Sequence, residues 1–276
     1  MSTNVSRAVV VAGLVGAGVY AVLSRRTDSA WLRTNHAGRA VTLYAGPAAV
    51  LGAAAGTAAA PGPARARAAG VLAVLAAGGC GAYDDLVGAG DPRRGFRAHL
   101  GALRGGEVTS GAVKLFGIGA AGVLAGLLIE ERAVDGVLTG VVIAGTAHLV
   151  NLVDVGPGAA VGSVVLLGAV AGMSGAAAAA VLAPADLGER TMLGDTGAHG
   201  LGAALGVALA RRGGRRGGRT GRAALAVGLV AAAANGERVS GIARRASGVL
   251  RRVAVKGAAG HGRWPVVATS RLLIHP

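Results

Sequence analysis

The sequence has little charge, few aromatic residues and almost no cysteine. Of its 276 residues only 15% are charged and 3% are aromatic, whereas 53% are hydrophobic. Soluble domains carry about 25% charged residues, so this composition excludes an ordinary soluble domain. The single cysteine, Cys80, excludes an internal disulfide and a metal site built from several cysteines. The apolar segments consist mainly of Ala, Gly, Val and Leu, and small residues let membrane helices pack closely.

Long apolar runs recur over the whole chain, several of them near the roughly 20 residues that span a bilayer. They predict an all-α, polytopic transmembrane helical bundle of about eight spans, within a range of about seven to ten. The candidate spans are residues 8–23, 41–60, 68–87, 111–129, 136–153, 160–183, 196–210 and 223–236. The first run resembles a signal peptide, but Arg25 and Arg26 end it and further spans follow, so we expect a retained first helix. The region 160–195 fits either one span with a re-entrant piece or two short helices in succession.

The net charge is +15, from 28 basic and 13 acidic residues. The arginines gather in short segments between apolar runs, which favours membrane orientation and contact with anionic headgroups over nucleic-acid binding. The loops 24–40 and 88–110 are rich in arginine, and the positive-inside rule places both in the cytoplasm. The basic segment RRGGRRGGRTGR (211–222) should then also be cytoplasmic, yet a single helix after Asp195 would place it outside. Its side of the membrane therefore stays open.

We expect one transmembrane domain, residues 1–240, followed by a basic tail at 241–276. The tail mixes arginines with apolar residues such as Ile242 and Leu250, a pattern typical of an amphipathic helix on a membrane surface. The whole chain is therefore expected to be a multi-pass protein of the plasma membrane.

Three acidic clusters lie at the ends of apolar runs: Asp84–Asp85, Asp154 and Asp195. The predicted orientation places all three at the cytoplasmic face, and ionisable residues at membrane depth are functional candidates. Carboxylates that converge at one face can bind Mg²⁺, which prefers oxygen ligands and often shares them with substrate phosphates. Lys114 and nearby arginines would supply the cations that a diphosphate needs. Together these residues suit phosphoryl transfer, although each carboxylate taken alone fits a helix cap or an arginine partner equally well.

Four motifs then occur in a fixed order: AYDDLVG, RGFRAHLGALRGGEVTSGAVKLFGIG, NLVDVGPG and ERTMLGDTGAHGLGAALG. This ordered set resembles the polyprenyl-phosphate N-acetylhexosamine-1-phosphate transferases (glycosyltransferase family 4), which include the phospho-MurNAc-pentapeptide translocase. The segments RTNHAGRAVTLYAGP and NGERVSGI fit the shorter members, so the resemblance extends from about Arg33 to Ile242. It implies Mg²⁺-dependent transfer of a phospho-sugar from a UDP-N-acetylhexosamine-type donor to undecaprenyl or decaprenyl phosphate. UMP is released, and the product serves cell-envelope glycan synthesis.

The resemblance also implies roles for individual residues. Asp84, Asp85 and Asp195 correspond to the catalytic aspartates, and one of the adjacent pair would deprotonate the lipid phosphate or attack the diphosphate. Asp195 and Asp84 would bind Mg²⁺, with Mn²⁺ as an alternative. The remaining expected contacts are Asn151 and Asp154 with the nucleotide, Lys114 with the phosphates, and Asn35 and Arg39 at the cytoplasmic entrance. Family members often dimerise, so a homodimer is a further expectation.

The sequence departs from the family pattern in several places. Gly156 and Ala159 stand where relatives carry arginines, and His199 replaces an asparagine four residues after Asp195. The histidine-rich loop of the translocase is missing, which argues against lipid II precursor synthesis and leaves the sugar open. These departures favour, as the alternative, a catalytically degenerate member that acts as a membrane scaffold or a lipid-phosphate binder. A small transporter would need aspartates near mid-membrane, whereas these aspartates lie at predicted helix ends.

Overall fold

The computed structural model describes residues 3–35, 37–88, 91, 93 and 96–247, and most of them are helical. The helices are α1 (Thr3–Leu23), α2 (Ala45–Ala59), α3 (Ala64–Val87), α4 (Phe96–Arg104), α5 (Ser110–Ile129), α6 (Ala133–Val153), α7 (Ala159–Ala171), α8 (Ala176–Leu187) and α9 (Gly194–Ala234). A 3-10 turn, Ser29–Trp31, and two short strands, β1 (Leu32–Thr34) and β2 (Ala40–Thr42), connect α1 to α2.

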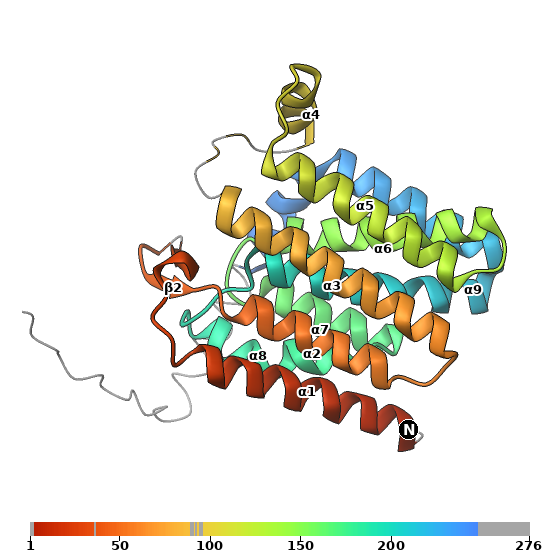
Figure 1. Cartoon of the computed structure of the whole chain (residues 1–276), viewed down its shortest axis with the longest axis horizontal. Helices are drawn as coiled ribbons and strands as arrows, with labels where there is room; N and C mark the ends of the chain where they lie inside the picture. Colours follow the sequence, from red (N-terminus) through yellow and green to blue (C-terminus); the bar gives the residue numbers. More distant parts are fainter. Residues whose placement is uncertain (1–2, 36, 89–90, 92, 94–95, 248–276) are drawn as a thin grey trace, which may run out of the picture.

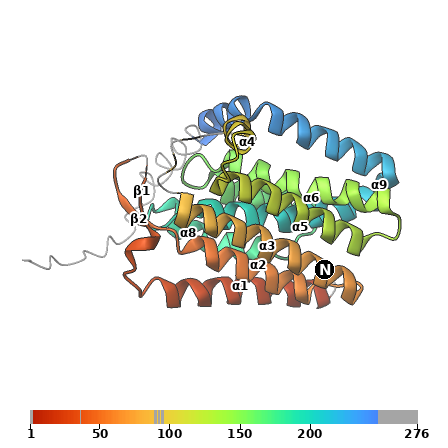
Figure 2. The same cartoon turned by 45° about the horizontal axis from the view of Figure 1, so that its top comes forward.

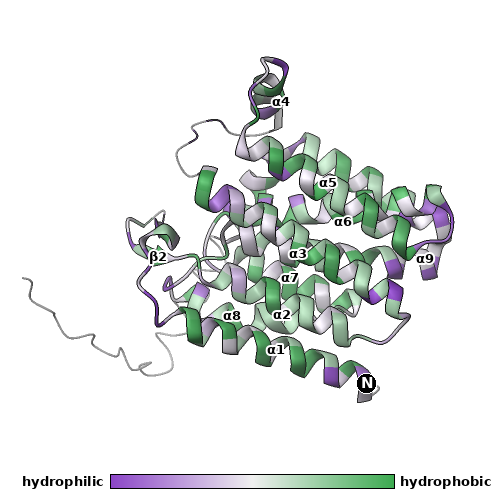
Figure 3. Cartoon of the chain, viewed as in Figure 1, coloured by the Kyte–Doolittle hydropathy of each residue, from purple (hydrophilic) through white to green (hydrophobic). Residues whose placement is uncertain are grey.

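Most helices run side by side in one bundle, with α1 at one edge and α5, α6 and α9 at the other (Figure 1). Four of them, α1, α3, α5 and α6, are long and apolar enough to cross a membrane. Hydrophobic residues cover the length of the bundle, and hydrophilic residues gather toward its two ends (Figure 3). The structure therefore confirms a mainly helical protein with membrane-length apolar helices, while the total of about eight spans stays a prediction.

Small residues let α6 pack tightly against both α5 and α9. A side chain at Gly126 of α5 would overlap the carbonyl oxygen of Gly136 on α6. A side chain at Gly202 of α9 would lie only 2.6 Å from the Cα atom of Ala147, again on α6. Because the apolar surroundings of a membrane do not drive helices together, such close contacts are a main source of helix association there. The glycine-rich composition is thus used at these interfaces.

Helices α7 and α8 form a hairpin that begins and ends at the same end of the bundle. Gly172 ends α7 with a φ of 74°, a left-handed conformation that glycine adopts without strain. Within the turn, the Ser174 hydroxyl donates a 2.9 Å hydrogen bond to the carbonyl of Gly56. At the open end, the N–H of Gly158 donates a 2.6 Å hydrogen bond to the Asp186 carboxylate. Of the two alternatives that the sequence left for this region, the structure shows two short helices.

Helix α9 is kinked, and the chain turns back at the kink. Its 41 residues are interrupted at Gly218, whose φ of 55° and ψ of −140° are not helical. The second arm, residues 219–234, runs back over α6, antiparallel to the first arm, residues 194–217 (Figure 2). The two arms correspond to the last two predicted spans. The basic segment 211–222 therefore contains the turn between the two arms. It lies at the end of the bundle opposite to the start of α9.

Ion pairs attach this basic turn to the connection between α5 and α6. Arg219 binds Asp135 through two hydrogen bonds of 3.0 and 3.2 Å. Arg222 donates a 2.8 Å hydrogen bond to Glu130 and lies 3.4 Å from Asp135. We call these four residues the opposite cluster. These ion pairs connect the acidic stretch EERAVDG (130–136) with the arginine-rich segment 211–222.

The structure adds local elements that the sequence analysis did not predict. Strand β2 occupies the start of the predicted span 41–60, so α2 begins only at Ala45. Helix α4 occupies part of the loop 88–110 and projects from the bundle beside the start of α5 (Figure 1). Residues 236–247 are helical, whereas residues 248–276 of the expected tail lie outside the described residues.

Candidate active site at one end of the bundle

A lysine joins two carboxylates from different helices at the end of the bundle where α3 ends and α9 begins. The Lys114 ammonium on α5 donates hydrogen bonds of 2.6 Å to Oδ2 of Asp84 on α3 and 2.5 Å to Oδ2 of Asp195 on α9. The Lys114, Asp84 and Asp195 side chains are 19%, 18% and 25% exposed, so a ligand can reach all three. We call them the site cluster.

The N-terminus of α5 fixes the position of Lys114. The Thr109 hydroxyl accepts a 3.1 Å hydrogen bond from the N–H of Ala112 and caps the helix, and Lys114 follows in its second turn. His99 of α4 lies 3.0 Å from the same hydroxyl, and its ring occupies the space that a side chain at Gly111 would need. Helix α4 is thus packed against the start of α5.

The site cluster lies in the wall of a cavity of about 770 Å³ with two chemically different parts. The polar part contains six of the residues predicted from the sequence: Asp84, Asp85, Lys114, Asn151, Asp154 and Asp195. The apolar part lies between α5, α6 and the second arm of α9, and its lining includes Leu115, Ile118, Val123, Val141, Ala144, Leu229 and Val230. Charged groups from three helices therefore adjoin an apolar groove.

The two adjacent aspartates of α3 face different partners. Asp84 contacts Lys114, whereas both carboxylate oxygens of Asp85 accept hydrogen bonds from the start of α9. The N–H of Asp195 donates to Oδ1 of Asp85 over 3.0 Å, and the N–H of Thr196 donates to Oδ2 over 2.8 Å. The Thr196 hydroxyl donates a further bond of 2.6 Å to Oδ2. Only one member of the pair is thus directed at the lysine.

Two histidines also line the cavity. His199 is 1% exposed, and its Nδ1 lies 2.7 Å from the Asp195 carbonyl oxygen. A carbonyl oxygen only accepts, so Nδ1 of His199 carries a proton and donates this hydrogen bond. His148 of α6 lines the same cavity. His199, which stands where the family resemblance implies an asparagine, lines the same cavity as the site cluster.

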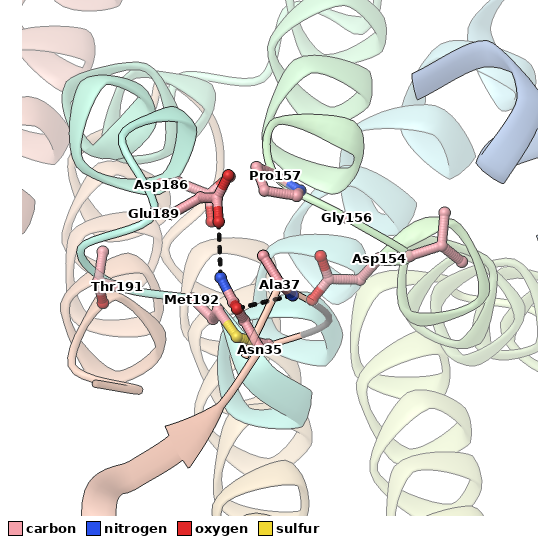
Figure 4. A pocket seen from close by; sticks show the side chains of 10 residues that line it. Asn35, Ala37, Asp154, Gly156, Pro157, Asp186, Glu189, Thr191 and Met192 are labelled. Atoms are coloured by element: carbon pink, nitrogen blue, oxygen red, sulfur yellow. Dashed lines mark hydrogen bonds between the residues drawn. The ribbon is translucent and has the colours of Figure 1, made fainter. Parts of the chain in front are cut away.

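A second, smaller pocket of about 60 Å³ adjoins the cavity, because Asp154 and Met192 line both. Figure 4 shows Asn35 in this pocket, with Glu189 on one side and Asp154 on the other. The Asn35 amide donates a 2.8 Å hydrogen bond to Glu189. Arg39 forms a 3.7 Å ion pair with the same carboxylate but lines neither space.

Burial alters the protonation of two carboxyls at this pocket. It raises the pKa of Asp154 well above its usual range, and the nearby carboxylates of Asp186, Asp195 and Asp85 raise it further. Burial also raises the pKa of Asp186 to about 6, although the hydrogen bond from the Gly158 N–H acts in the opposite direction. Both carboxyls therefore keep their proton to a higher pH than an exposed aspartate does.

The β1–β2 hairpin contacts two segments that line the cavity and the smaller pocket, one at Asp85 and one at Thr191 and Met192. The Arg33 guanidinium donates a hydrogen bond to the backbone carbonyl of Asp85. The Thr42 carbonyl accepts bonds of 2.8 Å from the N–H of Met192 and 2.9 Å from the hydroxyl of Thr191. The entrance role that the family resemblance implied for Asn35 and Arg39 stays a prediction, but Asn35 lies next to the site.

Sequence reasoning missed Asp186, Glu189, His99 and His148. Asp186 and Glu189 follow an apolar run in the region whose helices the sequence did not resolve, so their position near Asp154 was hidden. The histidines carried no local motif. Acidic residues that follow an apolar run, as Asp84 and Asp154 also do, were the one available signal.

The donor set bears on whether Mg²⁺ suits this end of the bundle. Within the described residues there is no group of three or more His, Cys, Asp or Glu side chains arranged to hold a metal ion. However, Asp84 and Asp195 already converge on a single cation, the Lys114 ammonium. Magnesium is usually held by one or two carboxylates together with substrate phosphates. These two carboxylates therefore fit an ion that shares its ligands with a bound diphosphate.

Comparison of the chain with protein-family models, with curated proteins and with solved structures gives no match. The family resemblance therefore rests on the ordered motifs of the sequence.

Proposed function

We propose that this chain is a Mg²⁺-dependent membrane transferase. It moves a phospho-sugar from a UDP-N-acetylhexosamine-type donor to a polyprenyl phosphate and releases UMP, for cell-envelope glycan synthesis at the cytoplasmic face of the plasma membrane. One structural observation supports this proposal above the others: a single cavity joins the site cluster to an apolar groove. A phosphate head on a long apolar chain needs both parts in continuity.

The apolar groove favours a lipid acceptor. Its walls come from α5, α6 and the second arm of α9, and they are lined by Ile118, Val141 and Leu229 among others. Gly119 lies in the same lining, and a side chain there would meet no atom within 4 Å, so the groove is open at this position. An isoprenoid chain in this groove would bring its phosphate to Lys114, where the polar part begins.

The polar part favours the nucleotide-sugar donor. Asn151 and Asp154 offer an amide and a carboxyl as hydrogen-bonding groups on the α6 side of the cavity. The small pocket with Asn35 and Glu189 continues from Asp154 and would accept further hydroxyl or amide groups of the donor. The diphosphate would then lie between these groups and the site cluster.

The residues of the site cluster have separable tasks in such a reaction. Lys114 neutralises phosphate charge, and it uses two of its three N–H donors on carboxylates. Asp84 either takes the proton of the lipid phosphate or attacks the diphosphate itself. Mg²⁺ held by Asp84, Asp195 and the diphosphate would neutralise the charge on the departing UMP. Overall, an acceptor phosphate oxygen bonds to the sugar-bearing phosphorus, and the bridging P–O bond to UMP breaks.

The test is UMP release by purified protein in detergent, given Mg²⁺, undecaprenyl phosphate and a panel of UDP-sugars. We expect UMP with at least one donor, only when lipid and Mg²⁺ are both present, and none from Asp195→Asn. Folding of each sample is checked by thermal unfolding. Absence of UMP with every donor from folded protein would contradict the proposal. It would leave the degenerate lipid-phosphate binder, which undecaprenyl phosphate binding would then test.

A further inference from the structure

The N-terminus of α9 lacks a cap from its own sequence. An α-helix begins with N–H groups that have no partner within the helix, and a side chain at the cap position usually accepts from them. In α9 the cap position is Leu193, an apolar residue that makes no such hydrogen bond. The acceptor comes instead from another helix, because Asp85 of α3 accepts from the N–H groups of Asp195 and Thr196.

The backbone at this junction is built to bring α3 and α9 into contact. Gly194, the first residue of α9, has a φ of 60°, in the left-handed region that favours glycine. A side chain there would lie 2.9 Å from Oδ2 of Asp85. On the facing helix, a side chain at Gly81 would overlap the carbonyl group of Asp195. Any larger residue at either glycine would push the Asp85 carboxylate and the start of α9 apart.

The capping contact and the site cluster share one residue, Asp195. Its backbone N–H donates to Asp85 over 3.0 Å, while its carboxylate accepts from Lys114 over 2.5 Å. A negative carboxylate at a helix N-terminus also interacts favourably with the helix dipole, which adds to the hydrogen bonds. The geometry of the first turn of α9 thus decides where the Asp195 carboxylate lies relative to Asp84.

We propose that Asp85 is a positioning residue and that it acts on the reaction only through α9. Asp85 caps α9 from α3 and fixes Asp195 opposite Asp84, and these two aspartates, not Asp85, contact the ligand. Both Asp85 oxygens accept hydrogen bonds from α9, whereas Oδ2 of Asp84 accepts from the Lys114 ammonium in the wall of the cavity. The catalytic part of this assignment rests on the proposed function, while the capping part does not.

The two aspartates should therefore respond differently to the same change. Asn in place of Asp85 keeps one carbonyl oxygen for an α9 N–H, and the Thr196 hydroxyl can rotate to accept from the new amide. We expect Asp85→Asn to keep the KM values for both substrates and to lose roughly tenfold in kcat, a small change in barrier. Asp85→Ala removes every acceptor and should lose far more. Asp84→Asn should be inactive, because its carboxylate is needed at the ligand.

The experiment compares Asp85→Asn, Asp85→Ala and Asp84→Ala by UMP release and by thermal unfolding of the full chain in detergent. Loss of a cap should lower the unfolding midpoint of Asp85→Ala by about 2–4 °C relative to Asp84→Ala. Two variants of Thr196 provide the rescue test. Thr196→Val removes the hydroxyl donor to Asp85 and should lower kcat, and Thr196→Ser, which restores it, should return the activity.

Two results would overturn the proposal. One is an Asp85→Asn variant that is as inactive as Asp84→Asn while it unfolds at the wild-type temperature. The other is an Asp85→Ala variant no less stable than Asp84→Ala, which would remove the cap itself. If the wild type releases no UMP, the proposed function fails, and the unfolding comparison alone decides whether Asp85 positions α9.

Discussion

The two charged clusters of the bundle, one at each end, differ in how completely their charges are balanced. In the opposite cluster, two arginines face two carboxylates, and the Thr139 hydroxyl donates a further bond of 3.2 Å to Glu130. In the site cluster, the single ammonium of Lys114 faces two carboxylates, Asp84 and Asp195. Both clusters join three helical segments, so geometry alone does not separate them. The ratio of cations to carboxyl groups does separate the two clusters.

This difference indicates what each cluster is for. A balanced set of ion pairs has no net charge to offer a ligand, and here it fixes the turn of α9 to the connection between α5 and α6. The site cluster has two carboxyl groups for one cation and lies beside a cavity, which favours a further cation and the phosphates that accompany it. We therefore assign stability to one cluster and reaction to the other.

Asp84→Asn should have the largest effect on activity. The amide keeps the shape of the side chain but removes the charge that a phosphate-bound cation needs, so UMP release should fall by about 10³-fold. The unfolding midpoint should stay near that of the wild type. Asp28→Asn, which changes an aspartate of the turn after α1 that lies outside the cavity lining, is the matched control and should keep full activity. Equal rates for the two variants would contradict the assignment.

Lys114→Gln should come next. Without the ammonium, Asp84 and Asp195 face each other with no cation between them, so UMP release should fall by about 10²-fold. Stability should fall as well, by about 1–3 kcal/mol, because two partly buried carboxylates lose their partner. Lys114→Arg restores the charge and should return part of the stability. Wild-type activity in Lys114→Gln would remove the lysine from the mechanism.

Changes in the opposite cluster should reverse this pattern. Glu130→Gln and Arg222→Met each break an ion pair whose members are only 17% and 14% exposed. We expect each to lower the free energy of unfolding by about 1–2 kcal/mol, while the UMP rate of the folded protein is unchanged. The double variant gives the coupling energy, which should exceed about 0.5 kcal/mol. A coupling energy near zero would contradict the stabilising role of this ion pair. A loss of UMP release in the folded variants would contradict the assignment of the reaction to the site cluster alone.

Asp186→Asn should have the smallest effect, visible in the pH dependence of stability. Because burial raises the pKa of Asp186 to about 6, the folded state holds this proton more tightly than the unfolded chain does. The contribution of Asp186 to stability is therefore present below a pH of about 4 and is lost as the pH rises to about 6. Unfolding midpoints measured over this range should fall less in Asp186→Asn than in the wild type. Parallel curves would show that Asp186 does not titrate this way.

Much of the site could be placed from the sequence because its residues lie at the ends of apolar runs. Asp84, Asp154 and Asp195 were predicted to share one face, and the structure places them in the lining of one cavity. Lys114, a rare lysine within an apolar segment, lies between two of them. Helix ends are recognisable in sequence, and alternating helix directions then bring every second end together. The chemical roles of these residues stay predictions.

The division of labour between Asp84 and Asp85 could not be predicted. Adjacent residues on a helix point about 100° apart, and which of them faces α9 depends on how α3 is rotated against its neighbours. The hairpin of α7 and α8 could be predicted only as one of two alternatives, since its apolar sequence also has the length of one span. The kink at Gly218 lies in a segment where glycines alternate with arginines, so no single glycine stood out as the turn.

The most direct test of the account compares two aspartates that are each paired with a cation, one at each end of the bundle. Asp195→Asn and Asp135→Asn would be purified in the same detergent and checked for folding. Initial rates of UMP release would then be measured with Mg²⁺, undecaprenyl phosphate and the donor that the wild type uses. We predict background release from Asp195→Asn and the wild-type rate from Asp135→Asn. Equal rates from the two folded variants, or a loss confined to Asp135→Asn, would contradict the assignment of the reaction to the site cluster.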